Sequence, residues 1–504
     1  MNRKKFIRNI GTGFVGQLII IILGLIVPRI MITSYGSDTN GLLSTISQIF
    51  AYMALLEAGI GQAARNALYK PISQGDRRGI SHIASIARRY FRKVTIYYGI
   101  CVLVLSLACP IIIKTDVDSF TVFLVVLFEG LAGVISFYFV ETPSTILMAD
   151  GRGYVKSAIS VVNKTISYAV KIVMAAFGIN IAFLQFVYFL LTVIKVFFYR
   201  WYFYKKYSWI DFSAASAKEK LKDRNAFIVT EIAWTIFSST DMIVLSVFVS
   251  TKLSSVYSVY SLVFSNLNLL LNSVYSSVSY VLGCTFHEDE KKYVTYHDAF
   301  TTIFMGEMTI LMCITYILIL PFIHLYTNGV TDVEYIYTIL PVMFCLVQIL
   351  SWSRYVSGNL TGLAGYAKTV SYISIAEAIV NLFLSVLFVQ KWGIIGVLFA
   401  TVVALPIKVI YCTYVCDKKI LHRSVWRSMR IFIPNYLLFG ITIIVNHAIN
   451  LNINNYLSFA VNGCIVSIVC FAVGGIANYI ANPECIKIVK KLLKKDKPSL
   501  YLEF

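Results

Sequence analysis

The chain has few charged residues, and acidic ones are the scarcer kind. Only 14% of its 504 residues are charged, with 25 acidic and 44 basic side chains, while 58% are hydrophobic. Soluble globular domains carry about 25% charged residues. The polar surface that a soluble fold needs is therefore lacking, and the composition predicts a protein embedded in a membrane.

Signals for disulfides, metals and catalysis are equally scarce. The ten cysteines avoid the predicted external connections, so we expect no disulfide framework. Gly151–Ser157 lacks the glycine before the lysine of a phosphate-binding loop, and no second histidine follows His287 at zinc-protease spacing. We expect no catalytic or metal site and no cofactor, so that any energy coupling would use H⁺ or Na⁺.

Long apolar stretches dominate the chain. A bilayer core of about 30 Å needs about 20 apolar residues per helical crossing, and about fourteen such stretches follow one another. Their connections are alternately basic and nearly uncharged, the uncharged set holding only Lys114, Lys252 and Lys391 as basic residues. Because Lys and Arg stay on the cytoplasmic side, we predict an all-α membrane protein with about fourteen transmembrane helices and both termini in the cytoplasm.

Two basic segments also carry apolar residues at helical spacing. In Arg77–Lys93 and Ile486–Lys497 the apolar and basic residues separate onto opposite faces. This pattern predicts helices that lie in the cytoplasmic membrane interface. Such helices can serve as membrane anchors or as docking sites for a partner.

The chain also contains an internal repeat. Short motifs recur at offsets of 212, 216 and 215 residues, namely Gly153–Ser157 with Gly365–Thr369, Arg8–Asn9 with Arg224–Asn225, and Gly178–Ile179 with Gly393–Ile394. We expect two homologous six-helix lobes in parallel orientation around a central cavity, as in transporters that rock two lobes. The predicted parts are lobe 1–213, cytoplasmic linker 214–225, lobe 226–430, two extra helices in 431–480 and basic cytoplasmic tail 481–504.

Several motifs in the first lobe resemble those of Wzx-type polysaccharide (O-antigen) flippases. They are Asn40–Leu42, Leu55–Ala63, Leu68–Ile72, Gln74–Asp76 and Ala149–Tyr154. The resemblance implies the fold of the multidrug/oligosaccharidyl-lipid/polysaccharide exporter superfamily. It implies a transporter, not an enzyme, that moves an undecaprenyl-diphosphate-linked oligosaccharide to the outer leaflet of the bacterial inner membrane for capsule, O-antigen or exopolysaccharide synthesis.

The resemblance also implies partners and leaves alternatives. Lipid-linked oligosaccharide, membrane lipids and a polysaccharide polymerase with other assembly proteins would be partners, and nucleic acid would not. An ion-coupled multidrug efflux pump of the same fold is the alternative, although such pumps usually have twelve helices. A membrane-embedded enzyme of polysaccharide assembly would want a long external loop, and the external connections are short.

Ionisable residues inside spans are costly, which makes each a functional candidate. A diphosphate needs cations along its route, and the candidates for binding it are Arg29, Lys164 and Lys171. The two lysines are seven residues apart, hence on one face of span 5. They either line the cavity or form a structural pair with Glu129. Arg29 either lines the cavity, as the resemblance implies, or anchors span 1 at the interface.

The carboxylates inside the spans are candidates for ion coupling or gating: Asp241, Glu129, Glu377 and Glu57. Asp241, beside Ser239 and Thr240, is either a proton or Na⁺ site or a buried helix cap. Glu377 corresponds in the second lobe to the lysine region of span 5, so the halves can present opposite charges. Glu57 lies near a cytoplasmic helix end from which it can snorkel, and the same holds for Glu141, Lys195, Glu231, Arg354 and Lys408.

Overall fold

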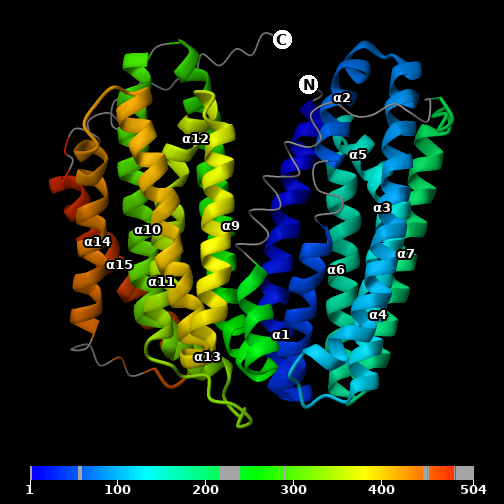
Figure 1. Cartoon of the computed structure of the whole chain (residues 1–504), viewed down its shortest axis with the longest axis horizontal. Helices are drawn as coiled ribbons and strands as arrows, with labels where there is room; N and C mark the ends of the chain where they lie inside the picture. Colours follow the sequence, from blue (N-terminus) through cyan, green and yellow to red (C-terminus); the bar gives the residue numbers. More distant parts are fainter. Residues whose placement is uncertain are drawn as a thin grey trace. The chain divides into compact units, whose positions relative to one another are not determined.

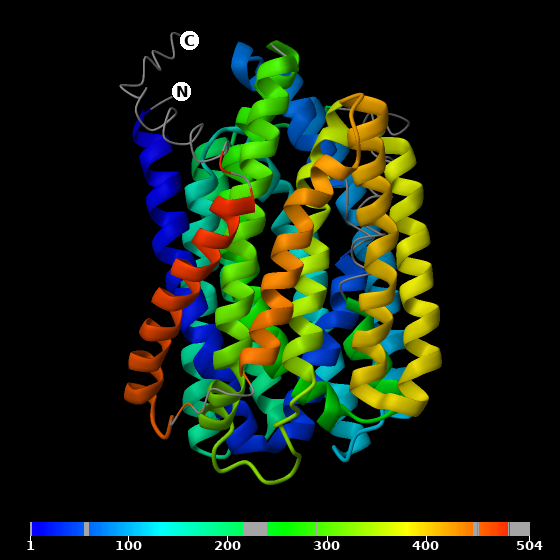
Figure 2. The ribbon, with the colours of Figure 1, turned by 90° about the vertical axis from the view of Figure 1, so that its left-hand side faces the viewer.

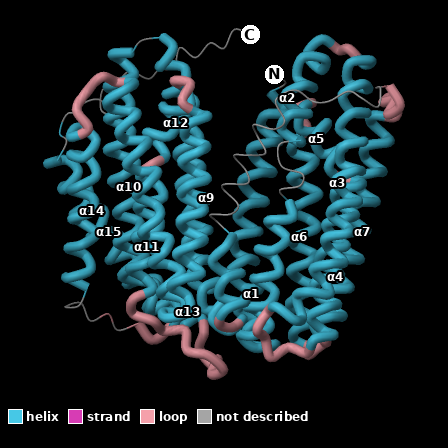
Figure 3. Tube along the Cα trace, in the orientation of Figure 1, coloured by secondary structure: helices cyan, strands magenta, loops and turns pink. Residues whose placement is uncertain are grey.

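The computed structural model describes residues 3–54, 60–214, 239–288, 290–446, 451, 453–481 and 483. Within these ranges the chain consists of helices and short connections, without a strand (Figures 1 and 3). The predicted all-α membrane fold is confirmed. The predicted linker 214–225 and most of the tail 481–504 lie outside the described residues.

The chain divides into two compact units. One comprises Met1–Ser258 together with Gly329–Val333, and the other comprises Val259–Asn328 and Glu334–Phe504. The helices up to residue 258 are α1 (Arg3–Ala54), α2 (Ile60–Gln74), α3 (Arg77–Ile112), α4 (Ser119–Phe139), α5 (Glu141–Ala149), α6 (Gly153–Ala176), α7 (Ile181–Tyr207), an apolar helix Ser239–Phe248, and the beginning of α9 (Thr251–Glu288).

The second unit contains the remainder of α9 and the later helices. They are α10 (Glu290–Tyr326), α11 (Leu340–Ser353), α12 (Tyr355–Leu363), α13 (Ala367–Tyr414), the π-helical segment η1 (Val415–Ile420), α14 (Trp426–Asn446) and α15 (Tyr456–Ala481). Both α14 and α15 pack against α10 (Figure 2). The Arg427 guanidinium ties α14 to α10 with a hydrogen bond of 2.7 Å from Nε to the Asp298 carboxylate.

Helices and predicted spans do not correspond one to one. Nine helices in the described ranges are long and apolar enough to cross a membrane. Two of the long helices each join two predicted spans across a kink, α1 at Gly36 (φ +84°) and α13 at Gly393 (φ +53°). Glycine tolerates these left-handed backbone angles because it has no Cβ. Predicted spans 4 and 10 are instead divided, into α4 with α5 and α11 with α12.

The divided helices place the internal repeat in exact register. Val140 separates α4 from α5, and Arg354, 214 residues later, separates α11 from α12. Gly151 and Gly365, again 214 residues apart, both have positive φ, at +68° and +85°. The sequence match of Gly153–Ser157 with Gly365–Thr369 is therefore two residues out of step with the helices.

The predicted interfacial helix Arg77–Lys93 is wrong as a separate element. It forms the first half of α3, a continuous helix of 36 residues that Asp76 caps by accepting a hydrogen bond from the Gly79 N–H. At 1.5 Å per residue such a helix is about 54 Å long, well beyond a bilayer core of about 30 Å. The basic half of α3 thus continues the transmembrane helix instead of turning along the membrane surface.

The apolar half of α3 shows how the unit meets lipid. Ile96, Ile100, Leu103, Leu107 and Ile111 follow one another at helical spacing and are all more than half exposed. On the other side, Tyr98 and Val102 are buried in a core shared with α1 and α4. An exposed apolar stripe of this length suits contact with acyl chains.

Candidate functional site

The structure brings Lys171 and Glu129 together on neighbouring helices of the first unit. Lys171 on α6 and Glu129 on α4 are both half-buried and interact electrostatically. The Gln185 amide on α7 donates a 3.1 Å hydrogen bond to Glu129 Oε2. Lys171 Nζ also lies 5.1 Å from the centre of the Tyr188 ring, within cation–π range. Lys171 is thus compensated within its own unit.

The other two predicted cations have different surroundings. Lys164 is an exposed residue on α6, and its charge acts on Lys195 of α7. Lys195 interacts with Glu141 as well and donates a 3.1 Å hydrogen bond to Ser136 Oγ. Arg29 is half-buried on α1, directly after Pro28. Within the first unit, Lys164 is therefore the more accessible lysine of the predicted pair.

Asp241 is 5% exposed in the helix Ser239–Phe248. The Tyr257 hydroxyl of α9 donates a 2.9 Å hydrogen bond to Asp241 Oδ2. Its neighbour Thr240 shares a hydrogen bond with the Tyr52 hydroxyl of α1. A buried carboxylate held by a tyrosine is a chemically reasonable proton site, and it also fixes the position of this helix.

Glu377 lies in a buried cluster with two cations in the second unit. Arg354 Nη1 donates to both carboxylate oxygens of Glu377, and Lys408 interacts electrostatically with both partners. Arg354 is 4% exposed and Glu377 2%. Arg354 is therefore a buried partner of Glu377 and does not snorkel to the interface as we expected.

The clusters of the two units occupy corresponding positions in the repeat. Glu141, Lys164 and Lys195 interact in the first unit, and Arg354, Glu377 and Lys408 in the second. The repeat offset carries each member of the first set to within two residues of a member of the second. Acid and base are exchanged at two of these places, which is the opposite charge in the two halves that we expected of Glu377.

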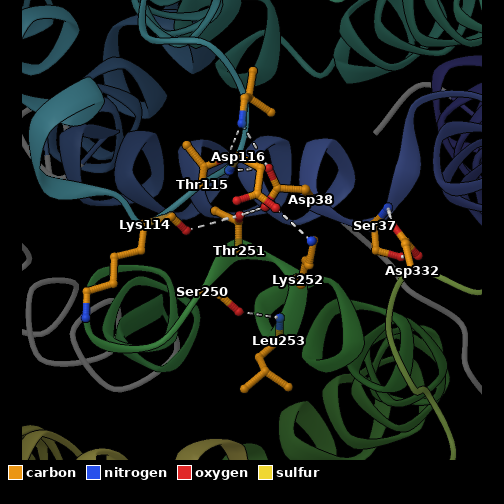
Figure 4. A network of polar contacts seen from close by, with 11 residues as sticks. Ser37, Asp38, Lys114, Thr115, Asp116, Ser250, Thr251, Lys252, Leu253 and Asp332 are labelled. Atoms are coloured by element: carbon orange, nitrogen blue, oxygen red, sulfur yellow. Dashed lines mark hydrogen bonds and ion pairs between the residues drawn. The ribbon is translucent and has the colours of Figure 1, made fainter.

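Sequence reasoning missed a polar network around Asp38, just after the kink in α1 (Figure 4). Asp38 Oδ2 accepts hydrogen bonds from Thr115 Oγ1 at 2.6 Å and from the Asp116 N–H at 2.8 Å. Oδ1 accepts from the Thr251 hydroxyl. Thr251 follows Asp38 by 213 residues, so corresponding segments of the two repeats meet here. No periodicity marks a single acid in a short connection.

The backbones approach closely beside this network. A Cβ on Gly41 would lie 1.7 Å from the Thr251 carbonyl oxygen. Asn40 Nδ2 donates a 2.8 Å hydrogen bond to Ser255 Oγ. Small and hydroxylated residues at such contacts are typical of helices packed within membranes.

Two predictions remain without a structural counterpart. Glu57 and Glu231 lie outside the described residues. In the described part of the chain, no three His, Cys, Asp or Glu side chains gather as a metal site would require.

Neither a protein-family model nor a curated protein matches this sequence. Solved structures do share its fold. The lipid II flippase MurJ in an inward closed conformation has a TM-score of 0.68 at 15% identity, covering 94% of this chain and 99% of its own. An inward-facing multidrug resistance MATE family transporter of the MOP superfamily has a TM-score of 0.65 at 13% identity, covering 79% and 94%.

A MOP superfamily transporter from Pyrococcus furiosus is also similar. Its TM-score is 0.59 at 14% identity, and the match covers 85% of this chain and 95% of that one. These solved proteins are transporters and a flippase, not enzymes. At such low identities the likeness concerns the fold, and the chain has the fold of the MOP-superfamily transporters.

Proposed function

We propose that the chain is a flippase that moves an undecaprenyl-diphosphate-linked oligosaccharide from the cytoplasmic to the outer leaflet for surface polysaccharide synthesis. The observation that carries this proposal is the extent of the match to the lipid II flippase. Helices α14 and α15 hold 21 and 26 of the 504 residues, more than the share of the chain that this match leaves uncovered. The likeness to a flippase of a lipid-linked glycan therefore extends beyond the two repeats.

The chemistry of the cargo supports the same function. The diphosphate carries at least two negative charges, and the apolar tail can remain in lipid while the head crosses. In our proposal Arg29 and Lys164 meet the diphosphate, and Lys171 contributes when it separates from Glu129. Lys164 supports this role best because it is exposed on α6. Guanidinium and ammonium groups are the usual protein ligands of phosphate.

Transport in this proposal proceeds by alternating access of the two lobes, in a bacterial inner membrane with both termini in the cytoplasm. Asp241 is the proposed proton or Na⁺ site, since it is buried and held by Tyr257. Glu129, Glu377 and Glu57 are proposed to gate the movement. A polysaccharide polymerase would consume the flipped unit and draw transport forward.

A deletion strain tests the function. Without the protein, lipid-linked repeat units should collect in the cytoplasmic leaflet and the surface polymer should be lost, and the intact gene should restore both. Lys164→Ala should fail to restore the polymer although its level in the membrane stays normal, while Lys164→Arg should restore part of it. Normal surface polymer combined with greater drug sensitivity would instead establish the efflux alternative.

A further inference from the structure

A second basic site lies in the first unit, away from the charged residues considered so far. It is a cavity of about 290 Å³ between α3, α4, α5 and α7 and the segment after α7. Its lining combines three arginines with aromatic side chains and a threonine: Arg88, Arg92, Tyr138, Phe139, Thr142, Pro143, Arg200, Phe203, Tyr204 and Phe212. We refer to it below as the arginine cavity.

The arginines of this cavity stack on aromatic rings and repel one another. The guanidinium carbon of Arg88 lies 4.3 Å from the centre of the Phe212 ring, that of Arg92 5.0 Å from Tyr138, and that of Arg200 5.4 Å from Phe139. The positive charges of Arg92 and Arg200 both act on Arg88. Among the described residues, no carboxylate lines the cavity to balance these charges.

Two polar atoms of the arginine cavity have no hydrogen-bond partner within the described ranges. They are Thr142 Oγ1 and Arg92 Nε, both buried. Thr142 as a residue is only 3% exposed. A buried polar group without a partner costs about 1–3 kcal/mol, which is a reason to expect a ligand that supplies the missing bonds.

The depth of the arginine cavity matches the level of lipid headgroups. Arg92 lies about 20 residues before the end of α3, and Arg200 about 20 residues after the start of α7, which is the length of one crossing. No charged residue occurs in α3 between Lys93 and its end. In the topology that we propose, the cavity opens at the cytoplasmic boundary of the hydrocarbon core.

We propose that the arginine cavity binds a phosphate group, carried by an anionic lipid headgroup or present as soluble phosphate. Arginine forks match phosphate oxygens in pairs, and the Thr142 hydroxyl can donate to a further oxygen. A volume of 290 Å³ is at the small end of ligand pockets, so it suits a headgroup and not a whole oligosaccharide. The ligand would bridge α3 and α7, and this site is independent of the flipping proposed above.

Lipid binding to the purified full-length protein tests this inference. Native mass spectrometry would count retained phosphatidylglycerol, with diacylglycerol as the lipid that lacks phosphate. We expect the wild type to retain one phosphatidylglycerol and no diacylglycerol. Thr142→Val is nearly isosteric and should fold, yet it should weaken binding roughly tenfold because one hydrogen bond to a charged group is lost. Arg92→Gln should weaken binding further.

Lys93→Gln is the matched control, since Lys93 is the exposed neighbour of Arg92 on the same helix. This variant should bind like the wild type. If it weakens binding as much as Arg92→Gln, or if Thr142→Val and Arg92→Gln change nothing, the proposal is overturned. Stabilisation of the wild type, but not of Thr142→Val, by millimolar inorganic phosphate without any lipid effect would keep the site and identify soluble phosphate as its ligand.

Discussion

Arg354 and Glu377 form a buried ion pair in which one guanidinium nitrogen donates to both carboxylate oxygens. The two distances from Nη1 are 2.6 and 2.7 Å. Lys408 adds a second cation to the pair. With one negative and two positive groups, the cluster as a whole has an excess of positive charge, and the carboxylate is the member on which the other two depend.

Replacing the members of this cluster should give a definite order of stability. Glu377→Gln leaves two buried cations without a counter-charge, and removing one partner of a buried pair costs about 3–5 kcal/mol. Arg354→Met leaves Glu377 with Lys408 and should cost less, while Lys408→Met leaves a neutral pair and should be tolerated. Thermal midpoints of detergent-purified fluorescent fusions would measure this. Wild-type stability of Glu377→Gln with loss of transport would point to gating alone.

The pairing of Lys171 with Glu129 predicts rescue by a double change. Lys171→Ala and Glu129→Ala should each lower the amount of protein in the membrane, because each leaves a partly buried charge uncompensated. The double variant should recover the amount. Lys164→Ala, on the same helix but exposed, is the control and should not change it. If the double variant also restores export, Lys171 has no role in binding the diphosphate.

Gly41 should tolerate no side chain. Gly41→Ala would place its Cβ 1.7 Å from the Thr251 carbonyl oxygen, so the two segments would have to move apart. We expect a large fall in the thermal midpoint. Gly24→Ala on the same helix meets nothing within 4 Å and should leave stability equal or raise it by up to about 1 kcal/mol. Equal behaviour of the two variants would contradict the close approach.

Membrane topology can be tested at exposed positions near the helix ends. Single cysteines at Ser119 and Asn328, in a variant without native cysteines, should react in intact cells with a membrane-impermeant thiol reagent. A cysteine at Gln74 should react only after the cells are opened. All three positions are exposed, whereas Ser37 is unsuitable because it is fully buried. The reverse pattern of labelling would invert the proposed orientation.

Much of the helical fold could be predicted from the sequence, since span length and basic connections are local properties. The repeat was also visible, because Gly178 and Gly393 mark the same turn in both halves. The course of Arg77–Lys93 was not, because a helix that leaves the bilayer and one that lies along its surface share the same pattern. Only the absence of a break after Lys93 distinguishes them.

The partners of the candidate residues were harder to predict. Arg354 was recognised as costly, yet its contact with Glu377 depends on how the α11–α12 junction packs on α13. Thr142 gave no signal, because a threonine near a helix start is common and only its burial in the arginine cavity makes it unusual. Such relationships depend on tertiary packing, which a local pattern in one sequence does not record.

The hydrogen bonds of Ser37 have a consequence for how the protein is made. Its N–H and hydroxyl both donate to Asp332, at 2.7 Å, across 295 residues of chain. The ribosome therefore delivers the acceptor long after the donor has entered the membrane. The first unit stays incomplete until Gly329–Val333 has been synthesised, so a nascent chain stalled before that point should remain a substrate for membrane quality-control proteases.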